Sequence, residues 1–116
     1  MALTYFINKK SVTYVLSLTG TITAADTDIL QKCIDEIDQS SPKYLILNMG
    51  AITSISKDAH SALTIFQRTI RQKSTLIICN VNDDILKILK TDGIIRESEV
   101  QSDLMSALKM ILSMET

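Results

Sequence analysis

Five polar residues lie close together where a run of apolar residues ends and a helical pattern begins: Ser56, Lys57, Asp58, His60 and Ser61. Hydroxyl and carboxylate groups in the first turn of a helix can pair with its free backbone N–H groups. The same N–H groups can bind an anion, so a phosphate or carboxylate placed here would be held by the fold and remain accessible to a partner. The segment is therefore typical of either helix capping or a charge-based recognition site.

Capping alone would account for two of these residues. If the helix begins near Lys57, Ser56 is the predicted N-cap, and its hydroxyl would accept a hydrogen bond from a backbone N–H, worth about 1 kcal/mol. Asp58 would then place a negative charge at the positive end of the helix dipole, which contributes roughly 0.3 to 1 kcal/mol. Helix stability is thus an alternative to a functional role for both.

The other reactive residue types give no catalytic pattern. A Ser/His nucleophile needs an orienting acid and an oxyanion hole, and the chain has a single histidine and no G-x-S-x-G elbow. We expect His60 and Ser61 to be solvated surface residues. Cys33 and Cys79 lie in apolar patterns without a CxxC spacing, which predicts buried thiols rather than a metal site. No enzymatic activity, cofactor or metal is therefore expected.

The elements that would position the polar segment follow from hydrophobic periodicity, which distinguishes strands from amphipathic helices. Strands are predicted at residues 5–8, 13–20, 43–49 and 75–80, with a weak strand at 95–98, and helices within residues 22–41, 58–73, 83–90 and 102–113. The order β β α β α β α β α predicts an α/β fold with a mixed sheet, an N-terminal antiparallel hairpin and helices packed on the sheet. Functional surfaces of such sheets gather where strands end and helices begin.

The same periodicity predicts which helical side chains face the core. The second helix is expected to bury Ala59, Ala62, Leu63, Phe66 and Ile70. Its polar face would carry His60, Thr64, Gln67, Arg68 and Arg71. The last helix is expected to bury Leu104, Leu108, Ile111 and Leu112.

Length and composition limit the classes of function. The chain has 116 residues, the size of one domain spanning 1–116, with 46% hydrophobic and 22% charged residues. Its net charge of −1 disfavours direct nucleic-acid binding. Apolar runs are far shorter than the roughly 20 residues that cross a bilayer, so no membrane insertion is expected. No secretion signal is evident, and the expected location is cytoplasmic.

Three segments in the predicted order resemble the STAS domain family, which includes the anti-sigma-factor antagonists. "LTGTIT" (18–23) resembles the family's L-x-G-x-(L/I)-D. "YLILNMGAITSISKDAHSAL" (44–63) resembles the strand and helix start that contain D-S-(S/T)-G. "LIICNVNDDILKILKTDGI" (76–94) resembles the family's L-x-(L/I)-x-N…V…(L/I)-x-x-x-G-(L/I) segment. The resemblance covers nearly the whole chain and implies a STAS-like fold.

The phosphorylation motif of regulatory STAS proteins is degenerate in this sequence. The resemblance places Ser56 at the motif's Asp, Lys57 at its first Ser and Asp58 at the residue that an anti-sigma kinase phosphorylates. Acidic positions at the end of the second strand fall on Thr21 and Thr23. Because neighbouring carboxylates are absent and Thr or Ser can donate hydrogen bonds to it, Asp58 is expected to be ionised at neutral pH. It would imitate a phosphoserine in part, since phosphate carries about −1.5 to −2 charges.

The resemblance implies a non-catalytic domain that binds an anti-sigma factor kinase, with a homodimer also allowed. The expected partner surface comprises Ser56, Lys57, Asp58, Ser61, Thr21 and Thr23, with Asn80 and Asn82 in a loop beside them. One alternative is a STAS-type subunit of a signalling complex or lipid-transport system without a phosphorylation cycle. Another is a phosphotransfer receiver in which Asp58 accepts phosphate, but Thr21 and Thr23 argue against the acidic metal site that receivers need.

Overall fold

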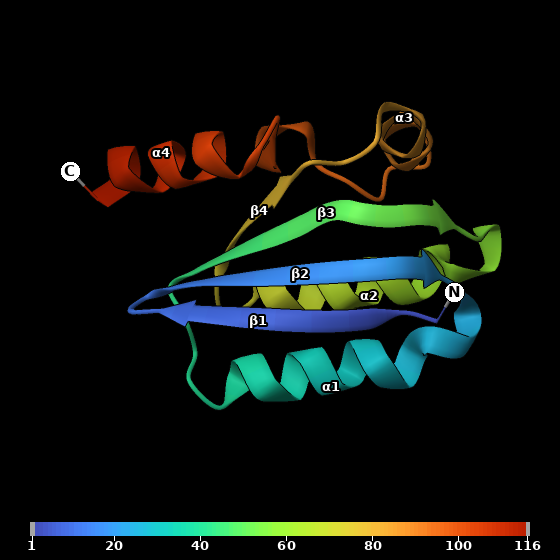
Figure 1. The fold of residues 1–116 in the computed structure, drawn as a ribbon, viewed down its shortest axis with the longest axis horizontal. Coiled ribbons are helices and arrows are strands. Elements are labelled where there is room, and N and C mark those ends of the chain that lie inside the picture. Colours follow the sequence, from blue (N-terminus) through green and yellow to red (C-terminus); the bar gives the residue numbers. More distant parts are fainter. Residues whose placement is uncertain (1, 116) are drawn as a thin grey trace.

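The computed structural model describes residues 2–115 and confirms the predicted order of elements (Figure 1). The strands are β1 (Thr4–Lys10), β2 (Thr13–Ile22), β3 (Tyr44–Ile55), β4 (Thr75–Cys79) and β5 (Val100–Gln101). The α-helices are α1 (Thr27–Asp38), α2 (His60–Arg71), α3 (Asp83–Thr91) and α4 (Leu104–Glu115). Single 3-10 turns occupy Ala24–Asp26, Lys57–Ala59 and Glu97–Glu99.

The five strands form one mixed sheet in the order β1-β2-β3-β4-β5. β1 and β2 are antiparallel, with Phe6 opposite Ser17, and the other neighbouring strands are parallel. The predicted hairpin and mixed sheet are therefore confirmed. Because the helices connect parallel strands, the carboxyl ends of β2, β3 and β4 point the same way and place their following loops at one end of the sheet.

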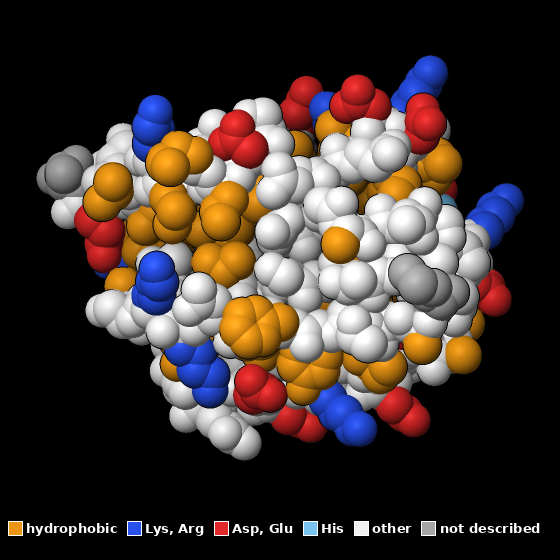
Figure 2. Space-filling view, viewed as in Figure 1, with side chains coloured by type: hydrophobic (Ala, Val, Ile, Leu, Met, Phe, Trp, Pro, Cys, Tyr) orange, Lys and Arg blue, Asp and Glu red, His pale blue; other side chains and the backbone are white. Residues whose placement is uncertain are grey.

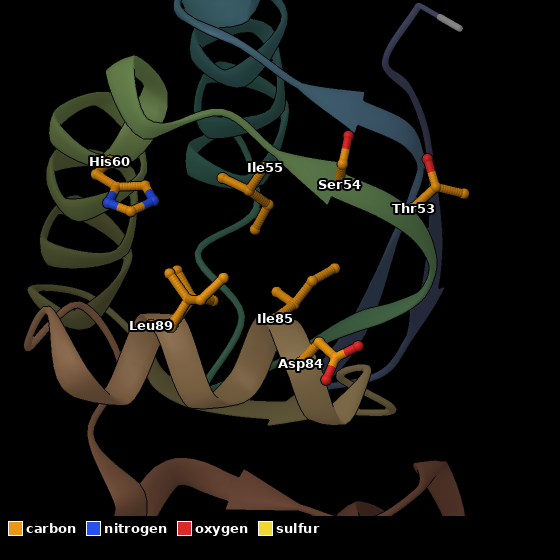
Figure 3. Close-up of a pocket in the computed structure, with 8 residues that line it drawn as sticks. Thr53, Ser54, Ile55, His60, Asp84, Ile85 and Leu89 are labelled. Carbon is orange, nitrogen blue, oxygen red and sulfur yellow. The ribbon is translucent and has the colours of Figure 1, made fainter.

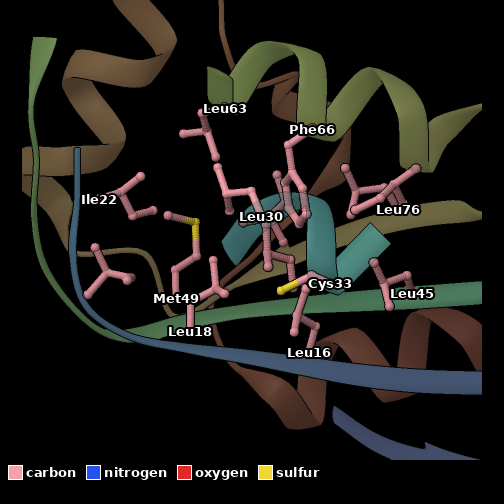
Figure 4. Packing of buried hydrophobic residues seen from close by; sticks show 14 of the residues in the cluster. Leu16, Leu18, Ile22, Leu30, Cys33, Leu45, Met49, Leu63, Phe66 and Leu76 are labelled. Atoms are coloured by element: carbon pink, nitrogen blue, oxygen red, sulfur yellow. The ribbon is translucent and has the colours of Figure 1, made fainter. Parts of the chain in front are cut away.

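One face of the sheet is covered by α1 and α2 and holds most of the core. Leu16 on β2 and Leu45 on β3 meet Cys33 on α1 and Phe66 on α2, all 1% exposed or less (Figure 4). The apolar stripes of α1 and α2 thus face the sheet, as their helical periodicity predicts. Both cysteines are buried and free, which confirms their predicted apolar role.

The opposite face is covered in part by α4. Ala107 and Ile111 of α4 pack on Ile46 of β3 and Ile77 of β4. The hairpin side of this face retains accessible apolar surface, and Phe6 of β1 is 66% exposed. Figure 2 shows hydrophobic side chains gathered over α4 and the adjoining part of the sheet.

The predicted inward face of α4 was wrong at one residue. Leu112 is 67% exposed, because α4 touches the sheet through Ala107 and Ile111 and Leu112 lies to the side of that narrow contact. The predicted position of the last strand was also wrong, because β5 begins at Val100 and not within residues 95–98. Ile95 is buried instead as part of the segment that leads from α3 to β5, so its hydrophobicity reflects core packing and not strand pairing.

The polar face predicted for α2 was also wrong at Gln67, which is 0% exposed. Its Oε1 accepts a hydrogen bond from Nη2 of Arg71 at 3.1 Å. Arg71 in turn donates to both carboxylate oxygens of Glu99, at 2.8 and 2.6 Å. The turn that carries Glu99 therefore packs over the end of α2 and covers a face that would otherwise meet solvent.

Candidate functional site

The polar segment lies where β3 ends and α2 begins. β3 is longer than predicted and runs to Ile55, and its last residues pair with the end of β2. The N–H of Ser56 donates to the carbonyl of Ile22 at 2.9 Å, which fixes the point at which the chain leaves the sheet. A 3-10 turn at Lys57–Ala59 then leads directly into α2. The predicted junction of strand and helix is thus present.

Ser56 and Asp58 contact each other at this junction. Ser56 occupies the predicted N-cap position with extended backbone angles (φ −72°, ψ 152°), but its side chain caps no backbone N–H. Its hydroxyl instead donates to Oδ1 of Asp58. The predicted capping bond was therefore wrong, because the nearby carboxylate is a charged acceptor and attracts the hydroxyl proton strongly. The expectation that a neighbouring hydroxyl donates to Asp58 is confirmed for Ser56.

Both charged residues of the turn are accessible to solvent. The side chains of Lys57 and Asp58 are exposed, and Ser61 is exposed one turn further along. Among residues 2–115, no ion pair includes Lys57 or Asp58. The turn therefore presents one carboxylate and one ammonium group to any molecule that approaches the start of α2.

The structure brings the end of β2 to the same place. Thr21 is paired in register with Ser54, next to the junction. The hydroxyl of Thr23 donates to Oδ2 of Asp26 at 3.1 Å and accepts from the N–H of Ala25 at 3.2 Å. Thr23 therefore caps the 3-10 turn before α1 and does not donate to Asp58.

Asn80 and Asn82 have polar partners outside this group. The side chain of Asn80 donates to Oδ1 of Asn48 at 3.1 Å, and Asn82 caps α3 by accepting from the N–H of Asp84 at 2.8 Å. Asp84 lines one cavity together with Ile55 and His60 of the junction. The loop that follows β4 therefore lies on the side of the junction that α3 occupies, and a single partner surface that includes both asparagines stays a prediction.

A cavity of about 140 Å³ lies at the junction of β3 and α2 (Figure 3). Its lining comes from the end of β3, the start of α2 and one side of α3: Thr53, Ser54, Ile55, His60, Asp84, Ile85, Ile88 and Leu89. In Figure 3 the side chains of Ile55, Ile85 and Leu89 point toward the same space. The sequence predicted the helix at 83–90 but not this cavity, because the cavity forms only where that helix packs against β3 and α2.

His60 is not the solvated residue that the sequence suggested. Its side chain is 16% exposed, and its Nδ1 lies 3.1 Å from Oδ2 of Asp92. The prediction was wrong because α3 and the residue that follows it pack across the start of α2. His60 consequently forms a wall between the cavity and the surface near Ser61.

Both cysteine thiols are buried in apolar surroundings. Burial raises the pKa of the Cys33 thiol to about 12 and that of the Cys79 thiol to about 11, so neither is a nucleophile at neutral pH. Within the described part of the chain, no three His, Cys, Asp or Glu side chains are grouped as metal ligands. No described helix has the length and hydrophobicity needed to cross a membrane.

Comparison with known proteins gives a family and several structural relatives. The family model of the STAS domain matches residues 7–107. A sulfate transporter family protein from Wolinella succinogenes is 25% identical over 93% of each chain, with a TM-score of 0.77. An anti-sigma factor antagonist from Mycobacterium paratuberculosis is 14% identical over 96% of this chain and 95% of its own, with a TM-score of 0.80.

A third structural relative is much longer than this chain. The murine anion transporter Slc26a9 is 16% identical, with a TM-score of 0.78 over 91% of this chain and 18% of the transporter. The curated protein sequences contain no match. The same fold thus occurs both as a separate regulator and as a small part of a transporter.

Proposed function

Because this chain belongs to the STAS domain family, we propose that it is a non-catalytic regulatory domain that binds an anti-sigma factor kinase. In this proposal Asp58 replaces the serine or threonine that regulatory relatives present for phosphorylation. The family membership and the fold shared with anti-sigma-factor antagonists support a regulatory role through protein partners.

The observation that carries the proposal is the placement of Asp58. Its carboxylate is exposed in the first turn after β3 and accepts a hydrogen bond from the Ser56 hydroxyl. A carboxylate has one negative charge, against about −1.5 to −2 for a phosphoserine, and fewer acceptor oxygens. Asp58 thus places a carboxylate where regulatory relatives carry the phosphorylated residue, and a kinase has no hydroxyl to modify at this position.

Phosphorylation by a cognate anti-sigma kinase tests this proposal directly. The chain is incubated with the kinase and ATP, and its intact mass is measured. We expect no added phosphate, because the acceptor hydroxyl is missing at position 58. Stoichiometric phosphate mapped to residues 56–61 would contradict the proposal. D58S restores a hydroxyl at the position and should gain one phosphate if the kinase still recognises the surrounding turn.

Binding of the same kinase gives a second measurement. D58A should weaken the affinity or alter it, while the free energy of unfolding falls by at most about 1 kcal/mol, since only a surface charge in a first turn is lost. D28A is a matched control, because Asp28 is also an exposed acid in the first turn of a helix, α1. Equal effects of D58A and D28A on kinase affinity would indicate general electrostatics rather than a specific contact.

A second candidate function is supported by the relative from Wolinella succinogenes, a sulfate transporter family protein at 25% identity. In this alternative the chain is a STAS-type subunit of a signalling or transport complex and has no phosphorylation cycle. Purified transport components and the anti-sigma kinase can be compared in the same binding assay. Affinity for a transport component together with none for the kinase would favour the alternative.

A further inference from the structure

The cavity beside the start of α2 is built by three elements that are distant in sequence. β3 contributes Ile55, α2 contributes His60, and α3 contributes Ile85, Ile88 and Leu89 (Figure 3). Ile85 is 9% exposed and Leu89 1%, so the inner wall belongs to the main core. Ile88 is 52% exposed and lies at the mouth. The cavity therefore joins the packed interior to the surface.

The size and lining of the cavity suit a single apolar group. An apolar cavity of about 150 Å³ can hold one molecule of the size of benzene, and this one measures about 140 Å³. One leucine, isoleucine or phenylalanine side chain is of that order. Ile55 and His60 flank residues 56–59 in the chain, so the cavity and the exposed turn that carries Asp58 belong to the same junction of β3 and α2.

The rim of the cavity carries an acid without a counter-charge. Asp84 lines the mouth from the first turn of α3. In residues 2–115 no ion pair includes Asp84, and Lys87, one turn further along α3, also has none. The carboxylate of Asp92, in contrast, is paired with His60. Asp84 is thus the negative group available to a cation brought by a ligand.

We propose that this cavity receives one aliphatic or aromatic side chain of a partner protein, and that a lysine or arginine of the same partner segment pairs with Asp84. The inference rests on the proposed function in requiring a protein partner at the start of α2. It adds the chemistry of the partner segment, which is an apolar residue next to a basic one. Burial of the apolar side chain supplies most of the affinity, and the ion pair supplies selectivity.

Disulfide capture tests the chemistry without any knowledge of the partner. I88C places a reactive thiol at the mouth, while Cys33 and Cys79 stay protonated because burial raises their pKa values to about 12 and about 11. Three disulfide probes are compared: an isobutyl group with an ammonium, an isobutyl group with a carboxylate, and a methyl group with an ammonium. Intact mass at increasing concentrations of 2-mercaptoethanol measures how strongly each probe is retained.

We expect the probe with isobutyl and ammonium groups to survive about tenfold more reductant than the methyl probe, because its alkyl group is buried. It should survive a few-fold more than the isobutyl carboxylate, because of Asp84. Adding D84N to I88C should remove the difference between ammonium and carboxylate and leave the isobutyl preference. M105C, at a position 62% exposed on α4, is the control and should show no preference.

Equal retention of the three probes by I88C, or the same ranking at M105C, would overturn the proposed cavity chemistry. A charge preference that persists with D84N would overturn the assignment of the basic partner residue. In the complex with an anti-sigma kinase, I88E should lower the affinity about tenfold or more, and full affinity would overturn the assignment to a partner side chain. If the kinase does not bind while the capture ranking holds, the proposed function fails and the cavity chemistry stands.

Discussion

Gly20 controls where the end of β2 lies relative to the junction, and its replacement by alanine tests that reasoning. Gly20 has φ +110°, a conformation that residues with a Cβ rarely adopt. A Cβ added there would lie 2.5 Å from the carbonyl oxygen of Ala2. The register between β2 and β3 also shifts between Gly20 and Thr21. Glycine thus allows the backbone of β2 to approach Ala2 closely and to continue through Thr21 to the end of the strand at the junction.

The expected loss of unfolding free energy in G20A has two parts. The unfavourable backbone conformation costs about 1 to 3 kcal/mol. The contact with a backbone oxygen, which is not the movable end of a side chain, adds about 1 to 3 kcal/mol of overpacking. G20A should therefore lower the free energy of unfolding by about 2 to 6 kcal/mol. At roughly 4 °C per kcal/mol for a domain of this size, Tm falls by about 8 to 24 °C.

Gly93 provides the matched control. It also has positive φ (+70°), but an added Cβ there has no described atom within 4 Å. G93A should cost only about 1 kcal/mol, since backbone strain is partly offset by the lower entropy of the unfolded chain. Thermal unfolding followed by circular dichroism compares the two variants. Equal losses of Tm in G20A and G93A would show that the contact with Ala2 is not a constraint and would refute the reasoning.

The remaining predictions concern the core, the thiols and the cap of α4. I111A should lower the free energy of unfolding in urea by about 2 to 5 kcal/mol and L112A by less than about 0.5 kcal/mol, because Ile111 is 5% and Leu112 is 67% exposed. Comparable losses in the two variants would show that α4 does not face the sheet through Ile111. Cys33 and Cys79 should resist iodoacetamide at pH 8 until the chain is unfolded, since burial raises both pKa values, and rapid labelling of the native protein would contradict this. Hydrogen bonds from Ser106 in the first turn of α4 lower the pKa of Asp103 below 3.8. The ionised Asp103 therefore stabilises the folded state above pH 3.8, and this stabilisation is lost as the pH falls through the pKa of Asp103 in the folded protein. The Tm difference between wild type and D103N should shrink over that range, and a difference independent of pH would exclude the charged cap.

The candidate site could be predicted in part. The placement of Asp58 in an exposed first turn follows from local sequence, because a long apolar strand ends there and an amphipathic helix starts. The hydrogen bond that the Ser56 hydroxyl donates to Asp58 was expected, but the absence of a capping bond from a backbone N–H to the same hydroxyl was not. The hydrogen bond between Asn80 and Asn48 was not predictable either, because it joins neighbouring strands whose register is set only in the folded sheet.

The order of the elements and the apolar stripe of α2 followed from the sequence alone, because strand and helix repeats depend on neighbours along the chain. The burial of particular polar residues depends instead on contacts between distant elements. His60 is covered because Asp92 and α3 lie across it, and Gln67 because the turn of Glu99 does. These contacts join segments about thirty residues apart, and no local pattern records which element will cover an exposed face. The cavity at the junction has the same origin, since its walls meet only when β3, α2 and α3 are packed together.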